Sequence, residues 1–205
     1  MGALTLYGTA RSRAARCLLA AEELGVAYKH VPIKPGPDSP DRKLLESINP
    51  NRRVPVLVDD GVALWESMAI NLYLGNKFTG QLWPTKAADL GRLYQWSVWV
   101  MTEVDRPDWQ ADRRSEDPTR RRRAKAGMRR ALHILDDALS TSPFLLGARF
   151  SLADVNVAGA LTQPGLPGHI LWQAFDLEAA GLSHLQRWLD ACFRRSAWRK
   201  VAELD

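Results

Sequence analysis

The sequence has few of the features that mark membrane, disulfide-rich or metal proteins. No apolar run approaches the roughly 20 residues that a membrane span needs, and no signal peptide is recognised before the first predicted strand. The two cysteines, Cys17 and Cys192, form neither a CxxC motif nor a disulfide framework. The four histidines lack the spacing of metal ligands. We therefore expect a cytoplasmic protein without a metal site or resident cofactor.

The sequence also lacks a basic module, although its net charge is +5. There are 10 basic and 8 acidic residues up to Lys77, and 18 and 15 after it. The run Arg120–Arg123 is the exception, but consecutive arginines point all round a helix, and acidic residues flank this run. A solvated helix face is the expected state of such a run. The composition therefore predicts neither a nucleic-acid nor a membrane partner.

The stretch from Leu4 to Gly25 predicts a strand followed by a helix. A β-prone run, Leu4–Tyr7, breaks at 8–10 and gives way to helix-forming residues up to Leu24. Gly25 is suited to end that helix, because glycine adopts the left-handed conformation without steric penalty. Ser12 lies where strand changes to helix. Its hydroxyl either caps a first-turn N–H or binds an anion held over the helix end.

The residues after Gly25 continue this pattern as an α/β domain over residues 1–77. A strand–helix–strand order predicts a right-handed crossover, and an Asp-Gly turn between two β-branched runs predicts a hairpin. After the first helix the expected elements are a strand at 27–33, a proline-rich loop at 34–40, a short helix at 41–48, hairpin strands at 54–58 and 62–65, and a helix that opens at Glu66-Ser67.

From residue 88 to 205 the pattern is entirely helical, after a linker at 78–87. A long helix is predicted from Lys86 to about Gln110, with Leu90, Leu93, Tyr94, Met101 and Val104 on one face. Trp96, Trp99 and Val100 are assigned to a second apolar face, which needs a helix, a ligand or another subunit to cover it. Further helices are expected from Asp117-Pro118 to about Ser140, from Ser151, from Ser183 to Arg194 and from Ser196 to Ala202.

Two predicted helix N-termini lie at one end of the expected sheet, at Ser12 and at Glu66-Ser67. Each offers unpaired N–H groups and partial positive charge, which suits a ligand with two anionic groups. Between them falls Val54-Pro55, a candidate cis peptide that would turn the Val54 backbone outward. Exposed backbone of that kind recognises extended peptides. The combination predicts a site for a short peptide with an anionic reactive end.

Four segments in this order and spacing resemble the cytosolic glutathione S-transferases. They are TARSRAARCLLAAEELG, NPNRRVPVLVDDG, WESMAINLYL and FSLADVNVAGAL. The resemblance covers nearly the whole chain and implies a thioredoxin-like N-terminal domain followed by an all-helical one. It is strongest to the serine-type classes (theta- and phi-like), in which S-x-x-x-R opens the first helix. Ser12 and Arg16 have that spacing.

The resemblance also implies roles for individual residues. Ser12 matches the hydroxyl that hydrogen-bonds the glutathione sulfur. The glutathione-binding positions are Arg53 near the glycyl carboxylate, Val54 before Pro55 at the cysteinyl unit, and Glu66 with Ser67 at the γ-glutamyl group. One position departs from the pattern, since the family often has glycine where Arg52 stands. The 34–40 loop is not matched.

Three alternatives to Ser12 as the thiol-activating group stay open at this point. Tyr7 ends the first strand, near the tyrosine of tyrosine-type transferases, but lies closer to the helix than that class requires. Cys17 would imply a redox enzyme that forms mixed disulfides, although its apolar neighbours favour a buried structural cysteine. Arg11 and Arg13 would act only through their charge.

The expected activity is transfer of glutathione, as co-substrate, to an apolar electrophile by a homodimer. The second-substrate pocket is assigned to Tyr7, Trp96 and Trp99, with Trp109 as a further candidate. A glutathione-dependent dehalogenase, peroxidase or isomerase is an alternative of the same family. A non-catalytic binding protein that keeps the fold is another.

Overall fold

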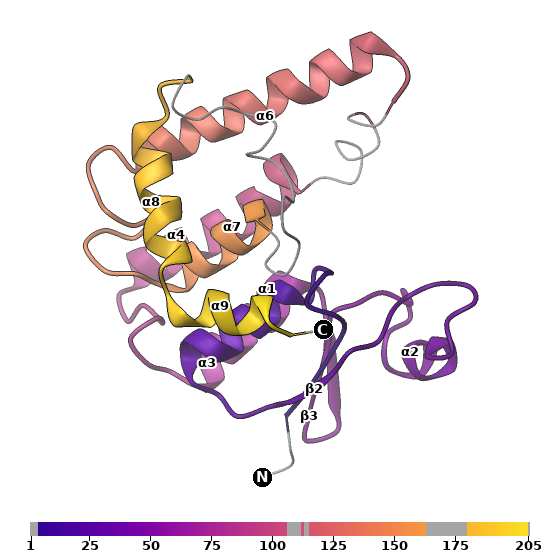
Figure 1. The fold of residues 1–205 in the computed structure, drawn as a ribbon. Helices are drawn as coiled ribbons and strands as arrows, with labels where there is room; N and C mark the ends of the chain where they lie inside the picture. Colours follow the sequence, from indigo (N-terminus) through magenta and orange to yellow (C-terminus); the bar gives the residue numbers. More distant parts are fainter. Residues whose placement is uncertain (1–3, 106–111, 113–114, 163–179, 205) are drawn as a thin grey trace. The chain divides into compact units, whose positions relative to one another are not determined.

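The computed structural model describes residues 4–105, 112, 115–162 and 180–204, which divide between two compact units. The described part of the first unit comprises residues 4–83 and 195–204. The second comprises the described residues from 84 to 162 and from 180 to 194. The last helix, α9 (Ser196–Ala202), contacts α1 (Ala15–Leu24) and groups with the first unit, whereas the sequence analysis places it in the second domain (Figure 1).

The first unit is built on a four-stranded mixed sheet in the order β2-β1-β3-β4. Strand β1 pairs parallel with β2, and β3 pairs antiparallel with both β1 and β4. In the hairpin, Asp60 and Gly61 have φ angles of 48° and 82°, as the Asp-Gly turn requires. The predicted α/β sheet is confirmed, with strands β1 (Thr5–Tyr7), β2 (Lys29–Val31), β3 (Val56–Asp59) and β4 (Val62–Trp65).

Successive strand residues point to opposite faces of the sheet, and helices pack on both faces. Helix α1 packs against α3 (Ser67–Lys77), and α9 is fixed to α1 by ion pairs from Arg195 to Glu23 (2.6 Å) and from Lys200 to Glu22 (3.1 Å). Helix α2 (Arg42–Ile48) contributes Leu45 to a separate buried cluster with Ile33 and Val56. Gly25 ends α1 with φ 65°, as predicted.

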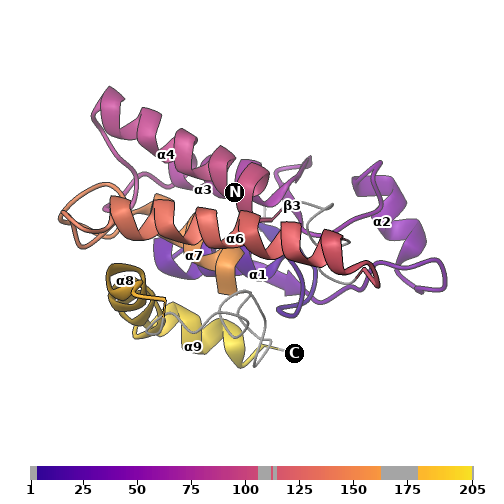
Figure 2. The same cartoon turned by 90° about the horizontal axis from the view of Figure 1, so that it is seen from above.

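The regular elements described in the second unit are all helices (Figure 2), and an isolated bridge pairs Phe144 with Gly147 in the turn before α7. Helix α7 contacts α4, η1 and α8, and α6 contacts η1 and α8. Asp117 caps α6 by accepting the Thr119 N–H at 2.7 Å, as the Asp-Pro start predicts. The helices are α4 (Ala87–Trp99), the π-helical segment η1 (Val100–Val104), α6 (Pro118–Ala138), α7 (Leu152–Thr162) and α8 (Ser183–Phe193).

The predicted division of the α4 region into two apolar faces is wrong. Trp96 is 9% exposed and Val100 fully buried, on the same side as Leu93, because this spacing of three and four residues follows one helical stripe. Tyr94, which the prediction assigned to the Leu93 face, is 44% exposed. The helix also changes from α to π at Val100 and ends before Asp105. Trp96 is therefore a core residue of the second unit.

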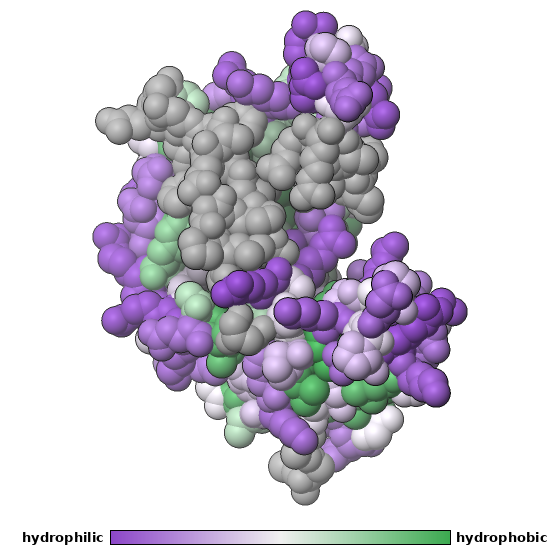
Figure 3. Space-filling view, turned by 45° about the vertical axis from the view of Figure 1, so that its right-hand side comes forward, coloured by the Kyte–Doolittle hydropathy of each residue, from purple (hydrophilic) through white to green (hydrophobic). Residues whose placement is uncertain are grey.

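None of the helices in the described ranges is long and apolar enough to cross a membrane. Hydrophilic side chains occupy much of the face shown in Figure 3, with smaller apolar patches among them.

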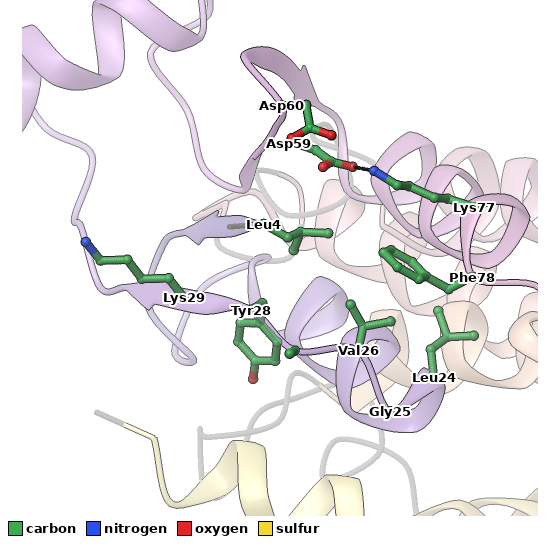
Figure 4. Close-up of a pocket in the computed structure, with 11 residues that line it drawn as sticks. Leu4, Leu24, Gly25, Val26, Tyr28, Lys29, Asp59, Asp60, Lys77 and Phe78 are labelled. Atoms are coloured by element: carbon green, nitrogen blue, oxygen red, sulfur yellow. Dashed lines mark hydrogen bonds and ion pairs between the residues drawn. The ribbon is translucent and has the colours of Figure 1, made fainter. Parts of the chain in front are cut away.

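A buried carboxylate joins α3 to the sheet at the end of β3. Asp59 is 3% exposed and accepts a hydrogen bond from the Lys77 ammonium (Figure 4). It accepts a second hydrogen bond from the Tyr73 hydroxyl at 2.7 Å. The bond from Lys77 and then that from Tyr73 hold the pKa of Asp59 below its usual value, against the opposing effect of burial. The ionised carboxylate is therefore the form that the fold stabilises.

This linkage predicts how stability depends on pH. Because the pKa of Asp59 is lower in the folded protein, its contribution is complete above the unfolded value of about 3.9 and is lost as the pH falls through the folded pKa. Asp59→Asn should lower the free energy of unfolding at pH 7 by about 1 kcal/mol and flatten its fall below about pH 4. Urea unfolding between pH 3 and pH 7 measures both. Asp38→Asn, at an exposed carboxylate, is the control; an equally steep acid dependence in Asp59→Asn contradicts this account.

Candidate functional site

Ser12 lies in the turn that leads from β1 into α1. Its Oγ donates to the Thr9 carbonyl at 2.8 Å and accepts the Ala14 N–H at 3.1 Å. The helix itself begins at Ala15, so the N-cap position belongs to Ala14 and not to Ser12. The hydroxyl nevertheless satisfies a backbone N–H at the helix entrance, and it has one hydrogen to give. To donate to a bound anion, Ser12 must turn that hydrogen away from Thr9.

The peptide bond between Val54 and Pro55 is cis, as the sequence analysis anticipated. The preceding loop is held by Asn49, which is 2% exposed. Its Nδ2 donates to the Arg53 carbonyl at 2.7 Å, and its Oδ1 accepts the Asn51 N–H at 2.9 Å. The sequence analysis did not select Asn49, although Asn-Pro-Asn is a typical setting for an asparagine that bonds its own loop. The Arg53 side chain is exposed.

The Ser12 turn and the Val54 loop meet at Gly8. Gly8 has φ +124°, and a Cβ placed there would lie 2.7 Å from the Ala14 Cβ and 2.9 Å from the Val54 Cβ. Both distances are too short for real carbon atoms, so only glycine fits this position without displacement of its neighbours. The two predicted site elements are therefore in direct contact through one residue that has no side chain.

Glu66 has an unusual backbone conformation at the start of α3. Its φ of 74° and ψ of 116° lie in a region that favours glycine, and no side chain caps the helix. Such conformations cost about 1–3 kcal/mol and tend to occur at functional sites. The Glu66 side chain is exposed, whereas Ser67 is 3% exposed. The Ser67 carbonyl accepts a hydrogen bond from Cys17 Sγ of α1 at 3.6 Å, which links α1 to the first residue of α3.

This environment gives Cys17 a structural role. Its thiol is fully buried, and burial raises its pKa far above the usual value, with the Arg16 charge only partly opposing the shift. A protonated thiol without solvent access is neither a nucleophile nor a redox centre. The preference for a buried structural cysteine is confirmed.

Tyr7 packs away from the Leu6 side of the sheet. Its ring contacts the buried cluster of Ile33, Leu45 and Val56, which includes the residue opposite Tyr7 in the ladder. Leu6, one residue earlier, is 1% exposed and points to the other face. Tyr7 therefore packs against the core beneath α2.

Arg52 stands at a position with a specific backbone requirement. Its φ is 53°, in the left-handed region that glycine adopts most readily. Its guanidinium Nε lies 3.3 Å from the Glu46 carboxylate, on the surface.

The residues predicted for a second substrate belong to different units. Trp96 and Trp99 form an edge-to-face pair in the second unit, with ring centroids 5.1 Å apart, and Tyr7 lies in the first unit. A shared pocket for these three residues stays a prediction. Trp109 lies outside the described residues.

The helix directions give the sheet of the first unit two electrostatically different ends. Helices α1 and α3 begin near the Ser12 turn and at Glu66, where the positive ends of their helix dipoles favour an anion. The first-turn N–H groups of α1 donate to the carbonyls of Ser12, Arg13 and Ala14, so α1 acts through its dipole. Both helices end beside a pocket of about 800 Å³, which Leu4, Leu24, Val26, Asp59, Lys77 and Phe78 help to line (Figure 4). The partial negative charge of helix C-termini does not favour an anion there. An anionic peptide is therefore expected at the Ser12 end.

In the part of the chain that the structure describes, no group of three or more His, Cys, Asp or Glu side chains is placed to hold a metal ion. The polar groups at the Ser12 end are a hydroxyl, backbone N–H groups, a carboxylate and a guanidinium. The hydroxyl, the N–H groups and the guanidinium can donate to an anion, whereas the Glu66 carboxylate can accept from a cationic group such as an ammonium.

Two family models match this chain, which together cover most of it. The glutathione S-transferase N-terminal domain matches residues 2–76, and the glutathione S-transferase C-terminal domain matches residues 118–191. A solved theta class glutathione S-transferase from the citrus canker pathogen Xanthomonas axonopodis pv. citri, with glutathione bound, is 28% identical at a TM-score of 0.80, over 99% of this chain and 98% of that one.

Relatives found by sequence belong to the same family and have similar identity to this chain. Glutathione S-transferase 3 of Zea mays is 26% identical over 98% of this chain and 94% of its own length. A glutathione S-transferase domain-containing protein of Dictyostelium discoideum is 29% identical over 75% of this chain. The match spans only 62% of that protein's own length. With the mixed sheet, the cis Val54-Pro55 bond and the helical second unit, these matches show that the chain belongs to the glutathione S-transferase family.

Proposed function

We propose that the protein is a glutathione transferase that conjugates the glutathione thiolate to an apolar electrophile. The observation that carries this proposal is the contact at Gly8, which joins the Ser12 turn to the Val54-Pro55 loop. Through this contact, the turn that carries the Ser12 hydroxyl lies beside the Val54 loop. A hydroxyl and a backbone segment in this arrangement match a ligand in which a thiol and a peptide unit are adjacent. The relative from Xanthomonas axonopodis pv. citri, solved with glutathione bound, supports this choice of ligand.

The tripeptide would bind at the end of the sheet where the N-termini of α1 and α3 lie. The Val54 backbone pairs with the cysteinyl unit in the manner of strand addition. Glu66 binds the γ-glutamyl amine, and Ser67 with the α3 N-terminus binds its carboxylate. Arg53 is exposed and free to approach the glycyl carboxylate.

Ser12 would stabilise the thiolate without removing its proton. Lowering the pKa of a thiol from about 8.5 by about 2 units requires roughly 2.7 kcal/mol of preference for the anion. A hydrogen bond to a charged group supplies about 1.5–3 kcal/mol, and a helix N-terminus adds about 0.3–1 kcal/mol. The two together suffice. The thiolate then attacks the electrophilic carbon.

Ser12→Ala tests this role. Loss of the hydroxyl should raise the pH midpoint of kcat/KM by about 1–2 units, with a smaller loss of glutathione affinity. The measurement is turnover of a generic chloronitrobenzene from pH 5.5 to pH 9.

Ser47→Ala is the matched control, because Ser47 also donates to a carbonyl three residues earlier, at 2.7 Å, but on the exposed surface of α2. An unchanged pH midpoint in Ser12→Ala refutes the assigned role.

A non-catalytic glutathione-binding protein is the second candidate. It is favoured by one observation, the Ser12 hydroxyl that donates to Thr9 and not outward. Retention on immobilised glutathione, without turnover of chloronitrobenzenes, halogenated substrates or peroxides, would select it. Turnover of halogenated compounds or peroxides alone would select a dehalogenase or peroxidase that uses the same site.

The working form proposed here is a homodimer. The large apolar side chains exposed in the structure include Val62 and Trp65 on β4 and Tyr94 and Val98 on α4, at 56%, 40%, 44% and 62% exposure. Strand β4 is also an edge of its sheet, where unprotected strands invite pairing with another chain. Tyr94 and Val98, four residues apart, lie on one face of α4, and β4 offers an unpaired edge, so each unit has a surface that a second copy would cover.

Val98→Glu should weaken such a dimer at least about tenfold, because a buried interface would then enclose an unpaired charge. Light scattering across a concentration series measures the dissociation constant. Ile134→Glu, at a 40% exposed residue of α6, is the control. A wild-type monomer at high concentration, or equal weakening by both variants, would overturn the assignment of this surface.

A further inference from the structure

The main chain of Gly8 is fixed by two hydrogen bonds to β2. Its N–H donates to the Val31 carbonyl at 2.9 Å, and its carbonyl lies 2.8 Å from Nε2 of His30. A carbonyl oxygen only accepts, so Nε2 carries the hydrogen. Both the Nε2–H tautomer and the imidazolium have that hydrogen, and the bond therefore does not depend on the charge of the ring.

The bond from His30 is not needed to align the strands. The parallel ladder already pairs Leu6 with His30 and Tyr7 with Val31 through the main chain. The half-buried imidazole extends beyond this ladder to the first residue after β1. Its Nε2 reaches the turn that leads to Ser12, which points to a role in placing that turn.

Gly8 transmits its own position to both parts of the proposed site. A Cβ on Gly8 would collide with Ala14, whose N–H is bonded to Ser12 Oγ, and with Val54. Gly8 has no side chain that could absorb a displacement. A shift of Gly8 therefore changes the distance between Ser12 Oγ and the Val54 backbone directly. Misplacement of such groups by about 1 Å reduces rates strongly, because a bound reactant no longer reaches all of them together.

We propose that His30 is a positioning residue for glutathione. By holding the Gly8 carbonyl, it sets the separation between Ser12 Oγ and the Val54 backbone to the span between the sulfur and the main chain of one cysteinyl unit. This role rests on the proposed function. It predicts that loss of the bond weakens binding of the peptide part and raises the pKa of the bound thiol together, while the removal of Ser12 affects mainly the thiol.

The experiment compares His30→Phe, which keeps a planar ring without a donor, with His30→Gln, whose amide nitrogen can donate to the same carbonyl. Calorimetry with glutathione and with S-methylglutathione, which has no thiol to ionise, separates the two contributions. His30→Phe should bind both ligands about 2- to 12-fold more weakly, the range expected for one hydrogen bond. The pH midpoint of chloronitrobenzene turnover should rise as well. His30→Gln should lie within about twofold of the wild type.

His133→Phe, at an exposed histidine of α6, is the matched control. The positioning role is overturned if folded His30→Phe keeps wild-type affinity for both ligands and the wild-type pH midpoint. It is also overturned if His30→Gln folds normally but loses affinity, which decides the matter even where His30→Phe does not fold. Wild-type protein that binds neither ligand refutes the proposed function itself, and this inference with it.

Discussion

The close approach at Gly8 is the constraint on which the proposed site depends. Three segments converge there from separate parts of the sequence: the end of β1, the entrance to α1 and the loop before β3. Their separation is set by the van der Waals radii of a few carbon atoms and not by flexible side chains. A thiol and the main chain of one amino acid are also a fixed distance apart. A rigid contact therefore suits this ligand better than an adaptable one.

The same unit separates its charges along the strands. Two helices begin on the side where Ser12 and Glu66 lie, and both end on the side where Lys77 pairs with Asp59. The partly exposed Lys77 ammonium satisfies the buried Asp59 carboxylate at the end of β3, while α3 begins without a side-chain cap. N–H groups left without caps cost stability in an isolated fold and become useful when an anionic ligand accepts from them.

Much of the fold follows from local sequence, and much of the site does not. The Asp-Gly turn, Gly25 and the Asp117-Pro118 helix start have local causes, and each lies where the pattern predicts it. Glu66-Ser67 does open a helix, but nothing local indicates the positive φ of Glu66. The roles assigned to Ser12, Arg53, Val54 and Glu66 came from family resemblance and stay predictions.

The error in α4 is one of periodicity, because Leu93 and Trp96, three residues apart, belong to one helical stripe and are both buried. The omissions concern contacts between distant residues. Gly8 was treated as a simple chain break, since its partners Ala14 and Val54 meet it only in three dimensions. His30 and Asn49 act on backbone carbonyls, and a sequence pattern does not show which carbonyl a side chain will meet.

The attachment of α9 to α1 has a consequence for synthesis of the chain on the ribosome. Arg195 binds both oxygens of Glu23 at 2.7 and 2.6 Å, although 172 positions separate the two residues. The partner that covers this carboxylate is thus translated only after the whole helical unit. A nascent chain that has emerged as far as Trp83 contains all four strands of the sheet, but the side of α1 that α9 covers stays exposed until residues 195–202 follow.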